Sequence, residues 1–148
     1  MGLDKGPFVE GVSVSVDDPY GGTDSINLNN GTVDVLILEV CVKDPEKTQV
    51  SIDSMAQIAV ENGATGPTTF EVLYEVLANG VTLGSINDLM DYEAVVANSG
   101  QHNNFPNFPL LDENPIAGIN TYILRCTEVQ GPSVFVGSRS LTATVFTV

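Results

Sequence analysis

The sequence contains no tryptophan, one histidine and only five lysine or arginine residues in 148. Aromatic residues make up 7% of the chain, so the flat surfaces on which sugar rings stack are scarce, which argues against a carbohydrate hydrolase or a lectin. The histidine, His102, lies in a Gln-His-Asn-Asn stretch, and no Gly-x-Ser-x-Gly motif accompanies it. We therefore expect His102 to lie exposed on a loop, and we expect no catalytic triad.

The sequence also offers no clear zinc site and no clear pair of catalytic carboxylates. One histidine and two distant cysteines, Cys41 and Cys126, do not supply the four ligands of a zinc site. The acidic residues are numerous, but nothing in their spacing selects a catalytic pair. The sequence predicts a protein that is not an enzyme. For the cysteines three states are open: buried free thiols, a bridge between packed sheets, or a disulfide between subunits.

The charge is strongly one-sided, with 19 acidic against 5 basic residues and a net charge of −14. Such a surface repels nucleic acid and anionic membranes and attracts cations. The first residues, MGLDKGPFVEG, lack the apolar segment of a secretory signal, and no later run is long enough to cross a bilayer. We therefore expect no nucleic-acid partner and no membrane insertion. Either the sequence is a mature chain with an engineered start, or the protein reaches its site without Sec export.

The residues that are present indicate many short strands. Hydrophobic residues make up 43% of the chain, and 14 glycines and 8 prolines punctuate it. The clearest element is Phe70–Asn87, FEVLYEVLANGVTLGSIN, where apolar residues of one parity run into Asn79-Gly80, a pair suited to a type I′ hairpin turn. Thr32–Val42 is almost continuously apolar, which predicts a central strand covered on both faces. Thr48–Val60 alternates with period two.

These elements and their turn spacing predict one all-β domain, an antiparallel β-sandwich of about eight to ten strands with a jelly-roll topology. A short helical turn is expected at Asn87–Met90. Residues Asn98–Pro115 show no periodicity and are expected to form a long loop. Its apolar residues Phe105 and Phe108 either pack over an open end of the sandwich or contact another subunit.

An acidic turn follows the first strand. Asp17, Asp18 and Asp24 offer three carboxylates around Gly21-Gly22, and hard cations such as Ca²⁺ take oxygen ligands from loops of this kind. The spacing does not match an EF-hand. A solvated acidic turn and a structural calcium site are both open, and no other cofactor is expected.

The segments YEVLANGVTLGSI and TYILRCTEVQGPSVFVGSRSLTATVF resemble jelly-roll surface domains of spore-forming Gram-positive bacteria. These are the tumour-necrosis-factor-like domains of exosporium glycoproteins and the subunits of spore appendage fibres. The resemblance covers roughly Thr48–Val148. It implies a structural, non-enzymatic protein that assembles with itself on a cell or spore surface. Members joined through an N-terminal cysteine pair differ from this chain, which has no such pair and no Gly-X-Y stem.

The N-terminal segment suggests how assembly occurs. Residues 1–10 are interpreted as a leader and residues 11–148 as the sandwich domain. The leader and first strand either complete their own sheet or pair with the sheet edge of a neighbour, in which case Phe8, Val12 and Val14 fill pockets there. A head-to-tail contact of this kind builds filaments. The alternative function is a carbohydrate- or protein-binding module that uses the 98–115 segment and calcium.

Overall fold

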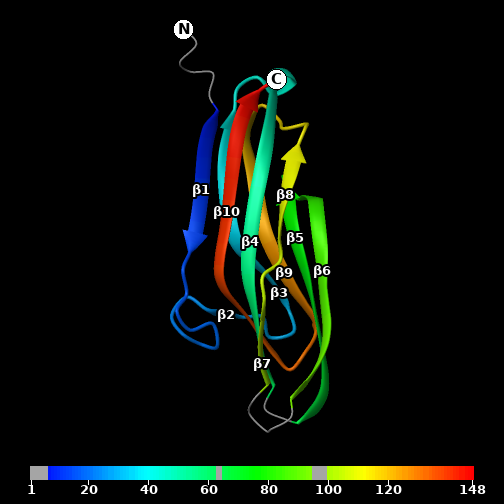
Figure 1. Cartoon of the computed structure of the whole chain (residues 1–148). Helices are drawn as coiled ribbons and strands as arrows, with labels where there is room; N and C mark the ends of the chain where they lie inside the picture. The colour runs from blue at the N-terminus through cyan, green and yellow to red at the C-terminus, as the bar shows by residue number, and fades with distance from the viewer. Residues whose placement is uncertain (1–6, 63–64, 95–99) are drawn as a thin grey trace.

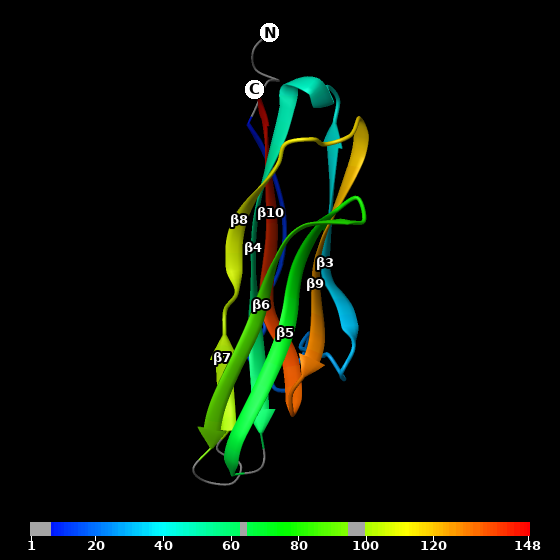
Figure 2. The same cartoon turned by 90° about the vertical axis from the view of Figure 1, so that its right-hand side faces the viewer.

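The computed structural model describes residues 7–62, 65–94 and 100–148. They form two antiparallel sheets packed face to face (Figures 1 and 2). This confirms the predicted β-sandwich. One 3₁₀ turn, η2 (Pro45–Lys47), is the only helical element in the described part of the chain, and no helix there is long and apolar enough to cross a membrane.

The first sheet has the order β1-β10-β4-β7, and β8 continues the edge that β7 begins, because both pair with β4. Its strands are β1 (Phe8–Val14), β10 (Ser133–Thr147), β4 (Thr48–Asn62), β7 (Gly100–Asn104) and β8 (Asn107–Asp112), with the short β2 (Ile26–Asn27) beside β10. The second sheet has the order β3-β9-β5-β6. Its strands are β3 (Thr32–Val42), β9 (Gly118–Gln130), β5 (Gly66–Ala78) and β6 (Val81–Ala94).

The strand order identifies the topology. The hairpin β5/β6 lies innermost, and β4 pairs with β7 and β8, β3 with β9, and β1 with β10 around it. These nested antiparallel pairs, folded so that they alternate between two sheets, are the jelly-roll arrangement. The pairing of the strands therefore confirms the predicted jelly roll.

The hairpin at Asn79-Gly80 has the predicted turn. Both residues have positive φ, 52° and 84°, as a type I′ turn requires. The turn is tied to the next strand, because the Asn79 amide donates to Oδ1 of Asn120 (3.0 Å) and accepts the Thr121 N–H (2.9 Å). The apolar residues of the predicted parity in β5 are fully buried: Phe70, Val72, Tyr74 and Val76.

Two local predictions are wrong. Asn87–Met90 is not a helical turn but part of β6, where Met90 pairs with Phe70 and Asn87 with Leu73. The run Thr32–Val42 is not a central strand but the edge strand β3, and its apolar Ile37 is 54% exposed. The continuous apolar run misled the prediction because Ile37 and Cys41 occupy the outer face, where polar residues were expected.

The expected loop at Asn98–Pro115 is also corrected. From Gly100 it forms β7 and β8, joined at Phe105-Pro106, and residues 98 and 99 lie outside the described range. The Pro106 carbonyl accepts the Ala56 N–H (3.2 Å), so β4 bonds the joint as well as both strands. His102 is half-buried within β7 rather than exposed on a loop.

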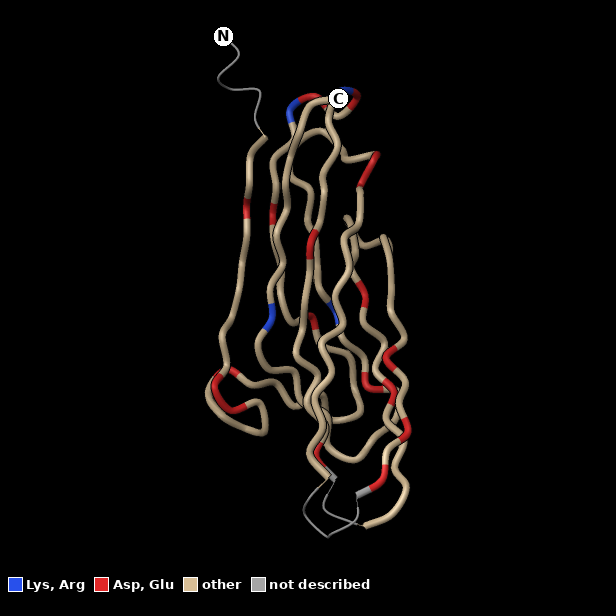
Figure 3. Tube along the Cα trace, in the orientation of Figure 1, with Lys and Arg blue, Asp and Glu red and all other residues tan. Residues whose placement is uncertain are grey.

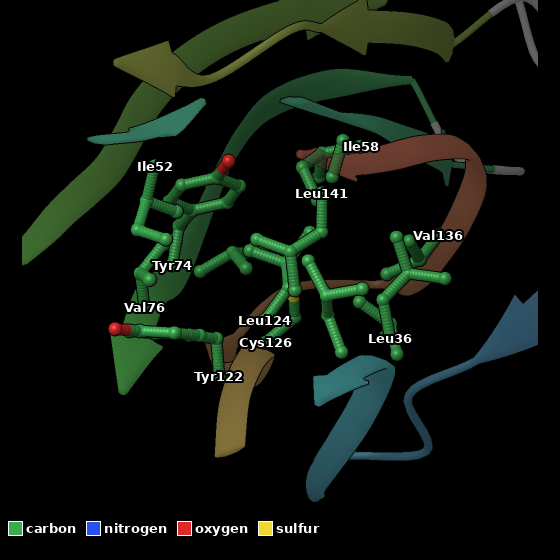
Figure 4. Packing of buried hydrophobic residues seen from close by; sticks show 14 of the residues in the cluster. Leu36, Ile52, Ile58, Tyr74, Val76, Tyr122, Leu124, Cys126, Val136 and Leu141 are labelled. Atoms are coloured by element: carbon green, nitrogen blue, oxygen red, sulfur yellow. The ribbon is translucent and has the colours of Figure 1, made fainter. Parts of the chain in front are cut away.

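The core between the sheets is apolar but contains two buried phenol groups (Figure 4). Tyr74 donates to Oγ of Ser54 (2.6 Å), and Tyr122 donates to the buried carboxylate of Asp112 (2.7 Å). Burial raises the pKa of Tyr74 to about 12. It also raises the pKa of Tyr122, which the bond to Asp112 raises further. Both hydroxyls therefore act as fixed donors at every physiological pH.

Arg139 fastens three segments together at the point where β10 bulges. Arg139 is 7% exposed, and its guanidinium donates to three backbone carbonyls, those of Val35 (3.1 Å), Asp24 (2.8 Å) and Gly137 (3.0 Å). Burial lowers the pKa of Arg139. A buried cation is tolerated here because carbonyl dipoles replace the water it loses.

Candidate assembly site at the N-terminal strand

The N-terminal strand is attached along one side only. β1 lies at the edge of its sheet and pairs with β10 from Phe8 opposite Val145 to Val14 opposite Arg139. Its first four residues are exposed, with Phe8 at 49% and Val9 at 66%. Among the described residues no strand pairs with the other side of β1, so the seven-residue ladder to β10 is the only strand pairing seen for it there.

The chain immediately after β1 has an attachment of its own. The Val16 N–H donates to Oγ of Ser138 (2.9 Å), and this hydroxyl donates to the Val16 carbonyl (3.3 Å). Val16 is buried, whereas Ser15 between it and the strand is exposed. Val16 is therefore attached to Ser138 independently of the β1 ladder, and the exposed Ser15 lies between the two attachments.

Beside β1 lies a groove of about 510 Å³ between the edges of the two sheets. β1 contributes Phe8 and Glu10, the end of β3 contributes Val40, Cys41 and Val42, and β10 contributes Val145. This volume lies within the range of ligand-sized clefts. Both Phe8 and Cys41 line the groove. The sequence analysis selected Phe8 as an assembly residue and Cys41 as a free thiol or disulfide residue.

The other residues proposed for assembly lie elsewhere. Val12 and Val14 point inward and pack, half-buried, against the core. Phe108 also packs into the core, with its ring 5.9 Å from that of Tyr74. Phe105 is 56% exposed at the joint between β7 and β8, at the opposite edge of the sheet from Phe8. Phe105 and Phe8 therefore belong to two separate surfaces.

The cysteines do not bridge each other. Cys41 is exposed and Cys126 is buried, and both are free. Cys41 pairs with Ile119 and Cys126 with Val33 on the same strand pair, so the two residues are roughly 23 Å or more apart along the strands. A disulfide needs Cα atoms within about 7 Å. Burial raises the pKa of Cys126 to about 12, so only Cys41 is accessible to another molecule.

The acidic turn does not form a metal cage. Asp18 uses Oδ1 to accept the Tyr20 N–H (2.9 Å), and Asp24 contributes its backbone carbonyl to Arg139. Among the described residues, no three His, Cys, Asp or Glu side chains are grouped closely enough to hold a metal. Asp17, Asp18 and Asp24 are thus placed in one loop without a shared coordination point.

Charge limits how two copies can meet. Acidic residues occur along strands and loops throughout the molecule, whereas basic residues are few (Figure 3). Arg125 forms the ion pair with Asp34 (2.6 Å) on the outer face of the second sheet. Like charges oppose close contact at low salt, so a contact made through backbone hydrogen bonds and apolar side chains is favoured over one made through this acidic surface.

Sequence reasoning missed the far wall of the groove. Val145 near the end of β10 and Lys43 just after β3 are distant in sequence from Phe8. The pairing of the first strand with the last places Val145 opposite Phe8. A signal existed in the alternation of Leu141, Ala143 and Val145, which marks one face of a final strand, but the partner of that strand could not be read from it.

No protein-family model and no curated protein sequence matches this chain. Among solved structures, dimeric latent PorU from Porphyromonas gingivalis is similar at 8% identity and a TM-score of 0.47, over 95% of this chain and 13% of PorU. A structure of infectious bursal disease virus, Gx strain, is similar at 14% identity and a TM-score of 0.47, over 93% of this chain and 33% of that one. A mutant VP2 protein of the same virus, from T=1 particles, has 14% identity and a TM-score of 0.44, over 94% of this chain and 32% of VP2.

This chain therefore spans a third or less of each of these structures. Similarities at TM-scores below 0.5 carry no conclusion about activity or partners, and the jelly-roll assignment rests on strand order. None of the three is a surface domain of a spore-forming bacterium.

Proposed function

We propose that this protein is a non-enzymatic structural subunit that assembles with itself into an extracellular or spore-surface fibre or layer. The observation that carries the proposal is the attachment of β1, an edge strand that pairs with β10 alone in the described part of the chain. It is followed by Val16, which bonds Ser138 separately. Ser15 between them is the pivot that the proposal requires. In the assembled form, β1 of one copy leaves its own sheet and pairs with β10 of the next copy.

Exchange preserves every contact that β1 makes within its own chain. The incoming strand forms the same ladder to β10, and its Phe8 lies over the same groove. The free-energy difference between the two arrangements is therefore small, and the outcome depends on concentration and on strain at the pivot. The backbone hydrogen bonds also give an acidic protein a contact that does not depend on charge complementarity.

A reversible lock on β1 tests the proposal. Ser13 and Ser140 are direct cross-strand partners with side chains on the outer face, and such partners have Cα atoms about 4.5–5.5 Å apart, within disulfide range. We would replace both by cysteine in a Cys41→Ser background. Oxidation then holds β1 on its own β10.

We expect the oxidised variant to remain monomeric in electron microscopy and light scattering, and the same sample to assemble after reduction. The reduced form is the matched control, because it has the same sequence. Circular dichroism of the oxidised form verifies that it is folded. Equal assembly with the lock closed and open contradicts strand exchange, and a wild-type protein that stays monomeric at high concentration and high salt contradicts the structural role itself.

A further inference from the structure

The strand β3 is the least protected sheet edge in the described part of the molecule. It lies at the outer side of the second sheet, and β9 is its only partner among the described strands (Figure 2). The other edges carry features that discourage pairing with another chain: β8 contains Pro109, β6 contains Asp91 and Glu93, and β1 has only seven residues. The eleven residues of β3 include no proline, glycine or lysine. A long apolar edge of this kind is a template for a further strand.

Only the second half of this edge is regular. The pairing of β3 with β9 shifts between Asp34 and Leu36, and a bulge of this kind turns the neighbouring edge out of line. From Leu36 to Val42 the register is unbroken. The end of the regular half borders the groove beside β1, to which Val40 and Cys41 contribute. No described strand pairs with β3 on that side, so the edge is open where it is regular.

Two charges near this edge have no opposite charge within one chain. Asp34, which precedes the bulge, is bound by Arg125. Glu39 and Lys43 are both exposed, and neither forms an ion pair with any residue that the structure describes. Four positions along an extended chain correspond to about 13 Å, so the two are too far apart to pair with each other. Each can therefore pair with an opposite charge on another molecule.

Apolar side chains adjoin the same edge on the outer face of the second sheet. Ile37 is 54% exposed and Ile119 is 52% exposed. Ile37 lies opposite Ile123, and the exposed Cys41 lies opposite Ile119. Exposed apolar side chains that are grouped in this way mark contact surfaces. A strand added to β3 would lie beside this group and cover part of it.

We propose that β3 of a second copy of this chain pairs with β3 in antiparallel orientation, about a two-fold axis at Cys41. Side chains of one face meet only where the paired residues have the same parity. A centre at Glu39 sets two carboxylates against each other, and a centre nearer the start of β3 extends the pairing into the bulge. A centre one residue to either side of Cys41 leaves both charges opposite neutral residues. The centre at Cys41 places Glu39 opposite Lys43 of the second copy, twice by symmetry.

This contact joins two four-stranded sheets into one continuous sheet. The ladder is short, so a single contact is weak, and subunits with a locked β1 remain monomeric in light scattering. Where strand exchange has linked many copies, such contacts act together and hold filaments side by side as a layer. The formation of a layer rests on the proposed function. The contact between two copies does not, because it uses a different edge from β1.

Charge reversal at the two positions tests the contact. A short bismaleimide, which alkylates one thiol on each of two molecules, is added to the folded protein, and dimers are quantified on a denaturing gel. Cys41 is the exposed thiol, and Cys41→Ser gives the background. The reagent reacts irreversibly, so it accumulates a weak contact. We expect Glu39→Lys and Lys43→Glu each to lower the dimer yield about tenfold, because two attractive pairs become repulsive.

Mixing the variants supplies the decisive comparison. In an equimolar mixture of Glu39→Lys and Lys43→Glu, both pairs of a mixed dimer are again Lys opposite Glu, so the yield should recover. Lys47→Glu is the matched control, because it makes the same charge change at another exposed lysine nearby and should leave the yield close to wild type. Glu39→Lys reduces the negative charge of a chain with net charge −14, so general repulsion alone would raise its yield.

A Glu39→Lys yield equal to or above wild type, a mixture without recovery, or a wild-type yield no higher than the Cys41→Ser background overturns the proposal. Circular dichroism verifies that each variant is folded. If one is not, hydrogen exchange of the wild type at rising concentration decides: amides between Leu36 and Val42 should gain protection while those of β6 do not, and equal behaviour contradicts the contact. A wild type that cross-links as expected but never forms fibres or layers contradicts only the proposed function.

Discussion

The two arginines of the chain provide the strongest test of how this sandwich is held together. Both lie on strands, but Arg139 is buried and bonded to three backbone carbonyls, whereas Arg125 forms a surface ion pair with Asp34. Replacing each by methionine removes the same charge and leaves a side chain of similar reach. The structure predicts very different results.

Arg139→Met leaves the carbonyls of Asp24, Val35 and Gly137 without their donor. Hydrogen bonds from a charged donor contribute about 1.5–3 kcal/mol each, so the three together contribute roughly 5–9 kcal/mol. Part of this is offset, because the variant no longer buries a cation whose pKa is lowered by desolvation. We expect a net loss of about 2–4 kcal/mol in the free energy of unfolding.

Urea unfolding followed by circular dichroism measures this loss. With a slope of about 2 kcal/mol per molar urea, the midpoint should fall by about 1–2 M. Arg125→Met should leave the midpoint close to the wild-type value, because exposed ion pairs contribute little. An Arg139→Met midpoint within error of the Arg125→Met midpoint refutes the view that Arg139 fastens the three segments.

Three further outcomes follow from the packing. A Cβ at Gly84 would lie 2.7 Å and 2.9 Å from the two Cδ atoms of Leu110, so Gly84→Ala should cost about 1–3 kcal/mol in chemical denaturation, and Leu110→Val should recover part of that cost. Tyr122→Phe removes a donor to the buried Asp112 carboxylate and should lower the free energy of unfolding by about 1.5–3 kcal/mol. Tyr74→Phe removes a hydrogen bond between two neutral groups, Tyr74 and Ser54, and should lower it by about 1 kcal/mol. Equal losses in the two variants would contradict this ranking. A thiol reagent should label one cysteine per native chain and two in denaturant, because Cys41 is exposed and Cys126 has a pKa raised to about 12, and Cys41→Ser should abolish the fast reaction.

Much of the fold could be predicted because its signals are local. The Asn79-Gly80 turn and the alternation of Phe70, Val72, Tyr74 and Val76 depend only on residues close in sequence, and the structure has both. The segment 98–115 was predicted as a loop because its prolines and asparagines obscure the pattern. Phe108 and Leu110 do share a parity that points to the core, and this alternation was the signal that could have revealed β8.

The contacts that define the sites are of longer range. The exposure of His102 was predicted wrongly because the two aromatic rings beside it, those of Phe70 and Tyr92, come from a different sheet. The burial of Arg139 depends on a bulge in β10 and on carbonyls of two distant segments. Neither can be inferred from neighbours in the chain, because composition and periodicity describe a strand's faces but not which strand lies opposite.

The two prolines at the far edge of the first sheet have a consequence for growth. Pro106 and Pro109, in the joint and in β8, carry no N–H and cannot donate to a strand laid beside them. Extension of that sheet is thus disfavoured on this side and open on the side of β1. In the assembly proposed above, the two ends would therefore be chemically different, and we expect them to lengthen at different rates.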